Sequence, residues 1–217
     1  MARLKVAVLI SGRGSNLQAL IDASADPDFP AEIALVVSSQ GDAGGLARAR
    51  AAGIRTEVIN HRAFNAKQGF EASIDATLRG AKVDLVCLAG FMRILTPWFV
   101  ERWRDRLVNI HPSLLPAFKG LDTHERVLAA GARFTGCTVH FVRPEMDEGP
   151  IIIQAAVPVM PDDDAETLAA RVLAAEHRCY PLAVCLIAQG RIRVRNERVE
   201  IAGALAPAEV MMFNPVG

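Results

Sequence analysis

Residues 4–16 read LKVAVLISGRGSN, in which the apolar run of residues 4–10 ends abruptly in the polar, glycine-rich residues 11–16. A continuous apolar run of this length is typical of a strand buried on both faces of a parallel sheet. Residues 17–21 then carry leucine and isoleucine at helical spacing, so we expect a strand-to-helix turn in which Ser15 or Asn16 caps the helix. The start of the chain therefore predicts a βαβ unit.

The alternation of strand and helix continues along the next part of the chain. We predict strands at residues 32–39, 55–60, 83–89 and 107–111, and helices near residues 44–52, 66–79 and 97–104. This order is typical of an α/β protein with a Rossmann-like, doubly wound and mostly parallel sheet that has helices on both faces. Ligands of such sheets bind beyond the carboxyl ends of the strands, which places residues 12–16, 90–93 and 109–111 along one cleft.

The later part of the chain has a different pattern. We predict a helix near residues 123–130, strands at residues 137–143 and 151–160, and a closing hairpin over residues 191–202. A long helix follows Asp163, which with Glu166 resembles a capping box, and Pro181 is expected to kink or interrupt this helix. Residues 204–217 form a tail without periodicity, for which packing back on the body is favoured over contact with a second subunit.

Composition limits the classes of protein that the chain can belong to. Its 217 residues are 51% hydrophobic and 22% charged, as in one α/β domain, and 24 basic side chains balance 24 acidic ones. A neutral chain offers no overall field for nucleic acid or an anionic membrane. No apolar window approaches the roughly 18 residues of a membrane span, and no cleavage site of a signal peptide follows the first strand.

The cysteines favour a reducing compartment. Cys87, Cys137, Cys179 and Cys185 have no CxxC spacing and lie within apolar patterns. Such thiols are typical of a cytoplasmic protein whose cysteines stay reduced.

The glycine-rich turn after the first strand is a candidate phosphate site. Arg13, Gly14, Ser15 and Asn16 offer a hydroxyl, backbone N–H groups and the amino end of a helix. The alternative is an ordinary tight turn whose arginine faces solvent.

A second candidate site combines an amide, an imidazole and a carboxylate. Asn109 and His111 share one face of a predicted strand, and Pro112 turns the chain away from the sheet, so the imidazole is expected in the cleft. Asp147 alone would be a turn former, but if it meets His111 the group can polarise a carbonyl, stabilise an oxyanion and move a proton. For His140, a core role and a site role remain equally open.

Two other chemistries find little support in the sequence. No HxxH, HExxH or paired-cysteine spacing predicts a metal site, so we expect none. Ser113 stands near His111, but no GxSxG motif accompanies it, and direct transfer is favoured over a covalent enzyme intermediate. The segment of Met92, Arg93, Ile94 and Leu95 can either face a flat heterocycle or simply pack.

Taken together, these segments resemble the phosphoribosylglycinamide formyltransferase family, within the superfamily that uses 10-formyltetrahydrofolate. The resemblance covers about residues 5–193 and is most specific at the block NIHPSLLP, residues 109–116. It implies a single formyltransferase domain over residues 1–217. About residues 1–105 would bind the phosphoribosyl substrate, and about residues 106–203 would carry the catalytic groups and the folate pocket.

The resemblance also implies roles for individual residues. The catalytic group would be Asn109, His111 and Asp147. The glycinamide ribonucleotide would be held by Arg13, Gly14, Ser15 and Asn16 at its phosphate and by Glu176. The folate would contact Met92, Arg93, Ile94, Leu95, Asn109, His140, Arg143, Glu145 and Asp147.

The activity implied is transfer of a formyl group from 10-formyltetrahydrofolate to the amine of glycinamide ribonucleotide in purine synthesis, without a metal. The partners would be these two small molecules, not nucleic acid or membrane, and the enzyme would be a monomer or homodimer. Alternatives are a formyltetrahydrofolate hydrolase, a methionyl-tRNA formyltransferase, a sugar-nucleotide formyltransferase, and a non-catalytic nucleotide-sensing module that would need only the first turn.

Overall fold

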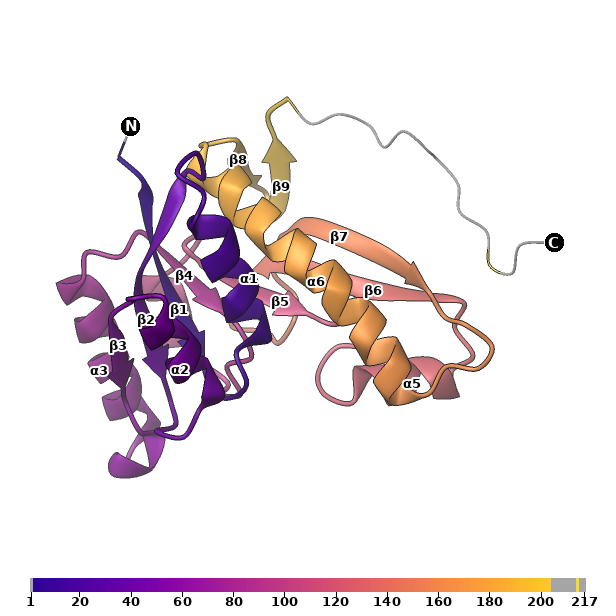
Figure 1. Ribbon diagram of the computed structural model, residues 1–217, viewed down its shortest axis with the longest axis horizontal. Coiled ribbons are helices and arrows are strands. Elements are labelled where there is room, and N and C mark those ends of the chain that lie inside the picture. Colours follow the sequence, from indigo (N-terminus) through magenta and orange to yellow (C-terminus); the bar gives the residue numbers. More distant parts are fainter. Residues whose placement is uncertain (1, 204–213, 215–217) are drawn as a thin grey trace.

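The computed structural model describes residues 2–203 and Asn214, and these residues form a seven-stranded sheet and a separate hairpin (Figure 1). The strand order is β3-β2-β1-β4-β5-β6-β7, in which β1 to β5 are parallel and β6 and β7 are antiparallel. The bounds are β1 Leu4–Ile10, β2 Ala31–Ser38, β3 Thr56–Val58, β4 Leu85–Leu88, β5 Leu107–His111, β6 Phe134–Phe141 and β7 Ile151–Pro158. The predicted mostly parallel sheet is confirmed.

The helices cover both faces of this sheet, as expected. They are α1 Ser15–Ser24, α2 Gly44–Ala51, the 3-10 helix η1 His61–Ala63, α3 Lys67–Gly80, α4 Pro97–Arg102, α5 Thr123–Ala129 and α6 Ala165–Ala188. The hairpin consists of β8 Ile192–Arg195 and β9 Arg198–Ile201. Figure 1 shows α6 lying across the sheet beside α1, with the hairpin at its carboxyl end.

The alternation of side chains along β1 explains the two layers of helices. Val6, Val8 and Ile10 belong to a core that includes side chains of α1, α2 and α6, whereas Ala7 and Leu9 belong to a core with α3 and α4. All five are at most 2% exposed. Because successive side chains of a strand point to opposite faces, a strand that is apolar throughout is stable only with both faces covered.

The sheet changes direction at β5, and this change positions the candidate site. β5 pairs in parallel with β4 on one side and antiparallel with β6 on the other, with Asn109 opposite His140. Residues 142–150 then connect β6 to β7, which starts opposite His140. The connection starts at the amino end of β5, where the N–H of Val142 donates to the carbonyl of Leu107, and it extends far enough for the Asp147 carboxylate to reach His111.

Local predictions at helix ends need correction. The N-cap of α1 is Gly14, with φ 73° and no side-chain hydrogen bond, rather than Ser15 or Asn16. A glycine takes this left-handed conformation at little cost, and the Asn16 side chain turns inward instead. The capping box of α6 is formed by Asp164 and Thr167, one residue later than predicted, while Asp163 pairs with Arg171.

Pro181 does not interrupt α6, which continues to Ala188. Proline removes one helical hydrogen bond, but its neighbours Tyr180 and Ala183 are completely buried against the sheet. Tertiary packing therefore outweighs the local preference.

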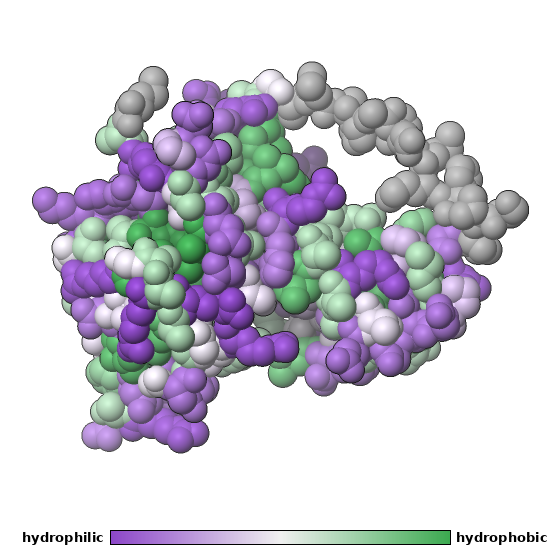
Figure 2. Space-filling view, viewed as in Figure 1, coloured by the Kyte–Doolittle hydropathy of each residue, from purple (hydrophilic) through white to green (hydrophobic). Residues whose placement is uncertain are grey.

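The remaining general predictions concern cysteines, membrane segments and the tail. The four cysteines are free, three of them buried, as expected for reduced thiols. Among the described residues, no helix has the length and apolar character needed to cross a membrane, and Figure 2 shows hydrophilic side chains over much of the face in view. The predicted packing of the tail falls on residues 204–217, which lie outside the described residues apart from Asn214; that side chain donates hydrogen bonds to the carbonyls of Arg133 and Val159.

Tyr180 is the buried link between α6 and the two central strands, so its hydroxyl should matter for stability. The oxygen lies 2.9 Å from the carbonyl of Leu88 and 3.2 Å from that of Val108. Tyr180→Phe keeps the ring but leaves these acceptors without the donor, which typically costs about 1–3 kcal/mol. We expect a loss of this size in the free energy of unfolding measured with urea; unchanged stability would contradict the role.

Candidate active site

The side chains of Asn109, His111 and Asp147, predicted to converge, lie together at the end of β5. His111 and Asp147 are 7% and 11% exposed in their side chains, and Nδ1 of His111 lies 3.5 Å from Oδ2 of Asp147. His140, from the adjacent strand, lies 3.9 Å from the other carboxylate oxygen and 3.4 Å from the Asn109 amide nitrogen. Four polar side chains from β5, β6 and the β6–β7 connection thus form one group.

A backbone contact determines which nitrogen of the His111 imidazole carries a proton. Its Nε2 lies 2.9 Å from the carbonyl oxygen of Phe118. Because a carbonyl can only accept, Nε2 carries a proton in this contact. Nδ1, which faces Asp147, attracts the ionised carboxylate only when it is protonated too, so the geometry is suited to an imidazolium–carboxylate pair.

His140 has the opposite arrangement and orients Asn109. Its Nδ1 donates to the carbonyl of Phe141 at 3.0 Å, which leaves Nε2 as an acceptor for the Asn109 amide. Burial lowers the pKa of His140 and favours this neutral form. One amide hydrogen of Asn109 is thereby directed to His140, and the other is left to donate to a bound oxygen.

The connection that carries Asp147 is pressed against β6. Asp147 has φ 58°, and its Oδ2 accepts the backbone N–H of Gly120 at 2.9 Å. A Cβ on Gly149 would lie 1.6 Å from the carbonyl oxygen of Phe141, so only glycine permits this approach. The position of the carboxylate therefore depends on backbone contacts on both sides of it.

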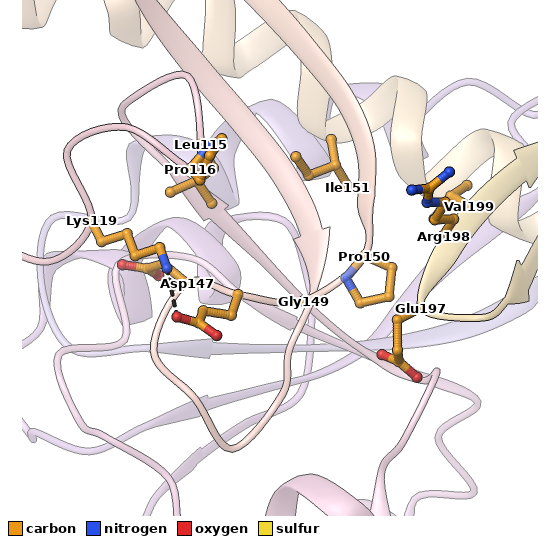
Figure 3. A pocket seen from close by; sticks show the side chains of 11 residues that line it. Leu115, Pro116, Lys119, Asp147, Gly149, Pro150, Ile151, Glu197, Arg198 and Val199 are labelled. Carbon is orange, nitrogen blue, oxygen red and sulfur yellow. Dashed lines mark hydrogen bonds and ion pairs between the residues drawn. The ribbon is translucent and has the colours of Figure 1, made fainter.

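A cavity of about 580 Å³ lies next to Asp147 (Figure 3). Lys119 and Glu148, paired at 2.6 Å, lie near Asp147 on one side, and Glu197 and Arg198 at the tip of the β8–β9 hairpin lie on the other. The remaining lining residues are Leu115, Pro116, Gly149, Pro150, Ile151 and Val199. The lining of the cavity therefore combines apolar and charged residues.

Ser113 is not placed as a nucleophile. Its side chain is completely buried and donates to the carbonyl of Ala117 at 2.6 Å, while its own carbonyl accepts the hydroxyl of Thr138. The peptide bond between Leu115 and Pro116 in the same segment is cis. These contacts favour transfer without a covalent intermediate on serine.

The glycine-rich turn lies beside α6. Asn16 donates from Nδ2 to Oε2 of Glu176 at 2.7 Å, and both residues are buried. Among the described residues, Oδ1 of Asn16 has no hydrogen-bond partner. Burial raises the pKa of Glu176. Gly14 and Ser15 start α1 next to this pair, and Arg13 is exposed.

The residues expected to contact a folate are divided between two environments. Met92 and Ile94 are 68% and 71% exposed, Arg93 is exposed, and Leu95 is buried. The N–H of Met92 donates to the hydroxyl of Ser11, which joins this segment to the end of β1. In the β6–β7 connection, Glu145 is exposed, whereas the Arg143 side chain is buried and forms ion pairs. In the part of the chain that the structure describes, no cluster of His, Cys, Asp and Glu could hold a metal ion.

Comparison with known proteins assigns the family. A family model described as formyl transferase matches residues 4–184. The phosphoribosylglycinamide formyltransferase of Haemophilus influenzae is 43% identical over 94% of this chain and 96% of its own length, and that of Escherichia coli is 42% identical over 95% and 97%. The chain therefore belongs to the formyl transferase family, among the phosphoribosylglycinamide formyltransferases.

Other relatives agree with this assignment. The trifunctional purine biosynthetic protein adenosine-3 of Bos taurus is 52% identical over 91% of this chain, which spans only 20% of that longer protein. The crystal structure of glycinamide ribonucleotide transformylase 1 from Symbiobacterium toebii superposes with a TM-score of 0.89 at 46% identity, covering 92% of this chain and 94% of that one.

Sequence reasoning missed the backbone groups that hold the site. The carbonyl of Phe118 and the N–H of Gly120 contact His111 and Asp147, yet any residue has such groups. The only local signal is the glycine itself, at φ 81°.

Gly149→Ala tests whether the close approach to β6 positions Asp147. The added methyl group must push the connection away from Phe141, and a displacement of about 1 Å can cost a hundredfold in rate. We expect formyl transfer to fall by about this factor in a folded protein. Gly80→Ala is the matched control, since nothing lies within 4 Å of its added Cβ. Equal rates for the two variants would contradict the role of Gly149.

Proposed function

We propose that this protein transfers the formyl group of 10-formyltetrahydrofolate to the amine of glycinamide ribonucleotide, in purine synthesis. The products are formylglycinamide ribonucleotide and tetrahydrofolate. The observation that carries the proposal is the convergence of Asn109, His111 and Asp147 around His140, in a chain that matches phosphoribosylglycinamide formyltransferases over nearly their whole length.

The amino half, about residues 1–105, would bind the ribonucleotide. Its phosphate fits the amino end of α1, where Arg13, Gly14, Ser15 and Asn16 offer a cation, backbone N–H groups and a hydroxyl. Glu176 lies beside this turn through its bond with Asn16. The acceptor on Asn16 that has no partner among the described residues is suited to a substrate donor.

The folate would lie where the two halves meet, the second being about residues 106–203. The exposed apolar side chains of Met92 and Ile94 are suited to a flat ring system, and Arg93 to its carboxylate tail. Leu95, His140, Glu145 and the residue 143–147 segment would form the rest of the pocket.

The chemistry follows from where donors are placed. The unprotonated amine attacks the formyl carbon, and negative charge develops on the formyl oxygen. Asn109 has one amide hydrogen free for this oxygen once His140 has taken the other. Donors that are already oriented stabilise such a charge without further reorganisation.

His111 and Asp147 would complete the reaction. Their 3.5 Å separation is longer than a hydrogen bond, so a proton on Nδ1 can be shared with the substrate oxygen. Asp147 stabilises the imidazolium and helps to move a proton, through water, from the amine to the departing folate nitrogen. This scheme uses no metal. We expect the enzyme to act in the cytoplasm, on small molecules only, as a monomer or homodimer.

A single assay separates this function from its nearest rival. The purified protein is incubated with 10-formyltetrahydrofolate, with and without glycinamide ribonucleotide, and folate deformylation is followed. We expect release only when the amine is present. Release without the amine would indicate a hydrolase, and no release would indicate a binding module; either result would contradict the proposal.

Asn109→Ala, measured in the same assay, tests the stabilisation of the oxyanion. Losing one such donor typically costs about 2.7–4 kcal/mol in the barrier, so kcat should fall by about 100-fold to 1,000-fold with little change in fold. Turnover close to that of the parent protein would refute this role.

A further inference from the structure

Arg143 belongs to the segment assigned to the folate pocket, but the proposed proton transfers do not involve its side chain. Its side chain is only 6% exposed, and each nitrogen of the guanidinium has a partner. Nε donates to Glu197 at 2.5 Å, Nη2 donates to Asp105 at 2.7 Å, and Nη1 donates to the Val142 carbonyl at 3.1 Å. Three of its five N–H groups are thus used within the protein, and its charge is already paired with two carboxylates.

Glu197 occupies an unusual backbone position. It and Asn196 form the two-residue turn between β8 and β9, with φ 55° and 49°. Turns of this kind favour Asn, Asp and Gly, and a glutamate gains nothing from the left-handed conformation. Its carboxylate, however, is held between Arg143 and Arg104, at 2.5 Å and 2.7 Å. The pairing with Arg143 lowers the pKa of Glu197 and keeps it ionised at neutral pH.

These contacts connect three segments that lie far apart in the sequence. Asp105 lies in the turn between α4 and β5, Arg143 starts the connection that carries Asp147, and Glu197 forms the tip of the hairpin. The hairpin tip also lines the cavity beside Asp147 (Figure 3). We call Arg143, Asp105 and Glu197 the ion clasp.

The ion clasp and Gly149 hold the connection at its two ends. At the far end, Gly149 is in contact with β6, and the carbonyl of Pro150 accepts the N–H of Phe141 at 2.9 Å. At the near end, Val142 packs against the core and its N–H donates to Leu107, and among the described interactions Arg143 is the only side chain of residues 142–146 that forms ion pairs with the body. Asp147 lies between these two anchors.

We propose that Arg143 is a positioning residue: through Glu197 and Asp105 it fixes the β6–β7 connection so that Asp147 stays beside His111. This inference rests on the proposed formyl transfer for its meaning in catalysis. Exposed ion pairs contribute little, but here the Arg143 side chain is buried although its carboxylate partners are about half exposed, so losing a partner leaves a buried guanidinium with less compensation. Loss of the Arg143 side chain should therefore loosen the β6–β7 connection rather than unfold the domain, because the sheet does not depend on this side chain.

A double-mutant cycle distinguishes positioning from direct folate contact. Arg143→Met and Glu197→Gln should each lower kcat for formyl transfer about tenfold, and the double variant should be no slower than either alone, because both break one clasp. The KM for glycinamide ribonucleotide should stay within about twofold. Arg195→Met removes an exposed pair in the same hairpin, with Glu200 at 3.7 Å, and should leave kcat unchanged.

Amide hydrogen exchange supplies a readout that does not depend on activity. Peptides covering residues 143–150 should exchange at least about tenfold faster in Arg143→Met and Glu197→Gln than in the parent protein and in Arg195→Met. If the parent protein had no formyl transfer activity, the deformylation assay would show this directly. Amide hydrogen exchange would still test whether the ion clasp holds the connection.

Two results would overturn the inference. If Glu197→Gln leaves kcat and exchange unchanged while Arg143→Met raises the KM for the folate, the arginine contacts the folate directly. If both variants lose only thermal stability and keep the parent kcat and exchange at 25 °C, the clasp is purely structural.

Discussion

The contact between the His111 imidazole and the Asp147 carboxylate is the constraint on which the site depends. Two groups from separate segments can share protons only if their positions are fixed within a few tenths of an ångström, and a surface loop does not provide this by itself. Here the imidazole is held by the Phe118 carbonyl, and the carboxylate by the Gly120 N–H. Both backbone groups belong to the segment that follows β5, and this segment therefore positions the two side chains relative to each other.

The sheet makes this arrangement possible by changing direction at β5. In a wholly parallel sheet, the chain after β5 would cross over through a helix before the next strand. The carboxyl end of that strand would then add another loop at the same edge of the sheet as the carboxyl end of β5. The antiparallel β6 instead runs back beside β5, so that His140 lies opposite Asn109. The β6–β7 connection then starts at the amino end of β5, and its Asp147 side chain reaches His111. In the proposed function, the parallel strands position the amino end of α1 for the substrate phosphate, and the reacting groups lie on β5 and on the antiparallel segment beside it.

The sequence predicts the sheet well because burial on two faces leaves a strong local pattern. β1 and β5 have the predicted bounds, and the grouping of Asn109 with His111 follows from side-chain alternation. Contacts between distant side chains could not be predicted, because they leave no periodic pattern in the sequence. Arg143 and Glu197 are 54 positions apart, and nothing near either residue indicates the other. The expected interruption of α6 at Pro181 is wrong because packing elsewhere outweighs the local preference, and no local pattern indicates the left-handed backbone of Asp147.

The central claim is that His111 and Asp147 act as one unit in formyl transfer, and a double-mutant cycle measures this directly. With His111→Asn, Asp147→Asn and the double variant, kcat is determined under saturating substrates. The account predicts strong non-additivity, with the double variant about as slow as the slower single variant. Independent effects, with the two losses multiplying in the double variant, would contradict it.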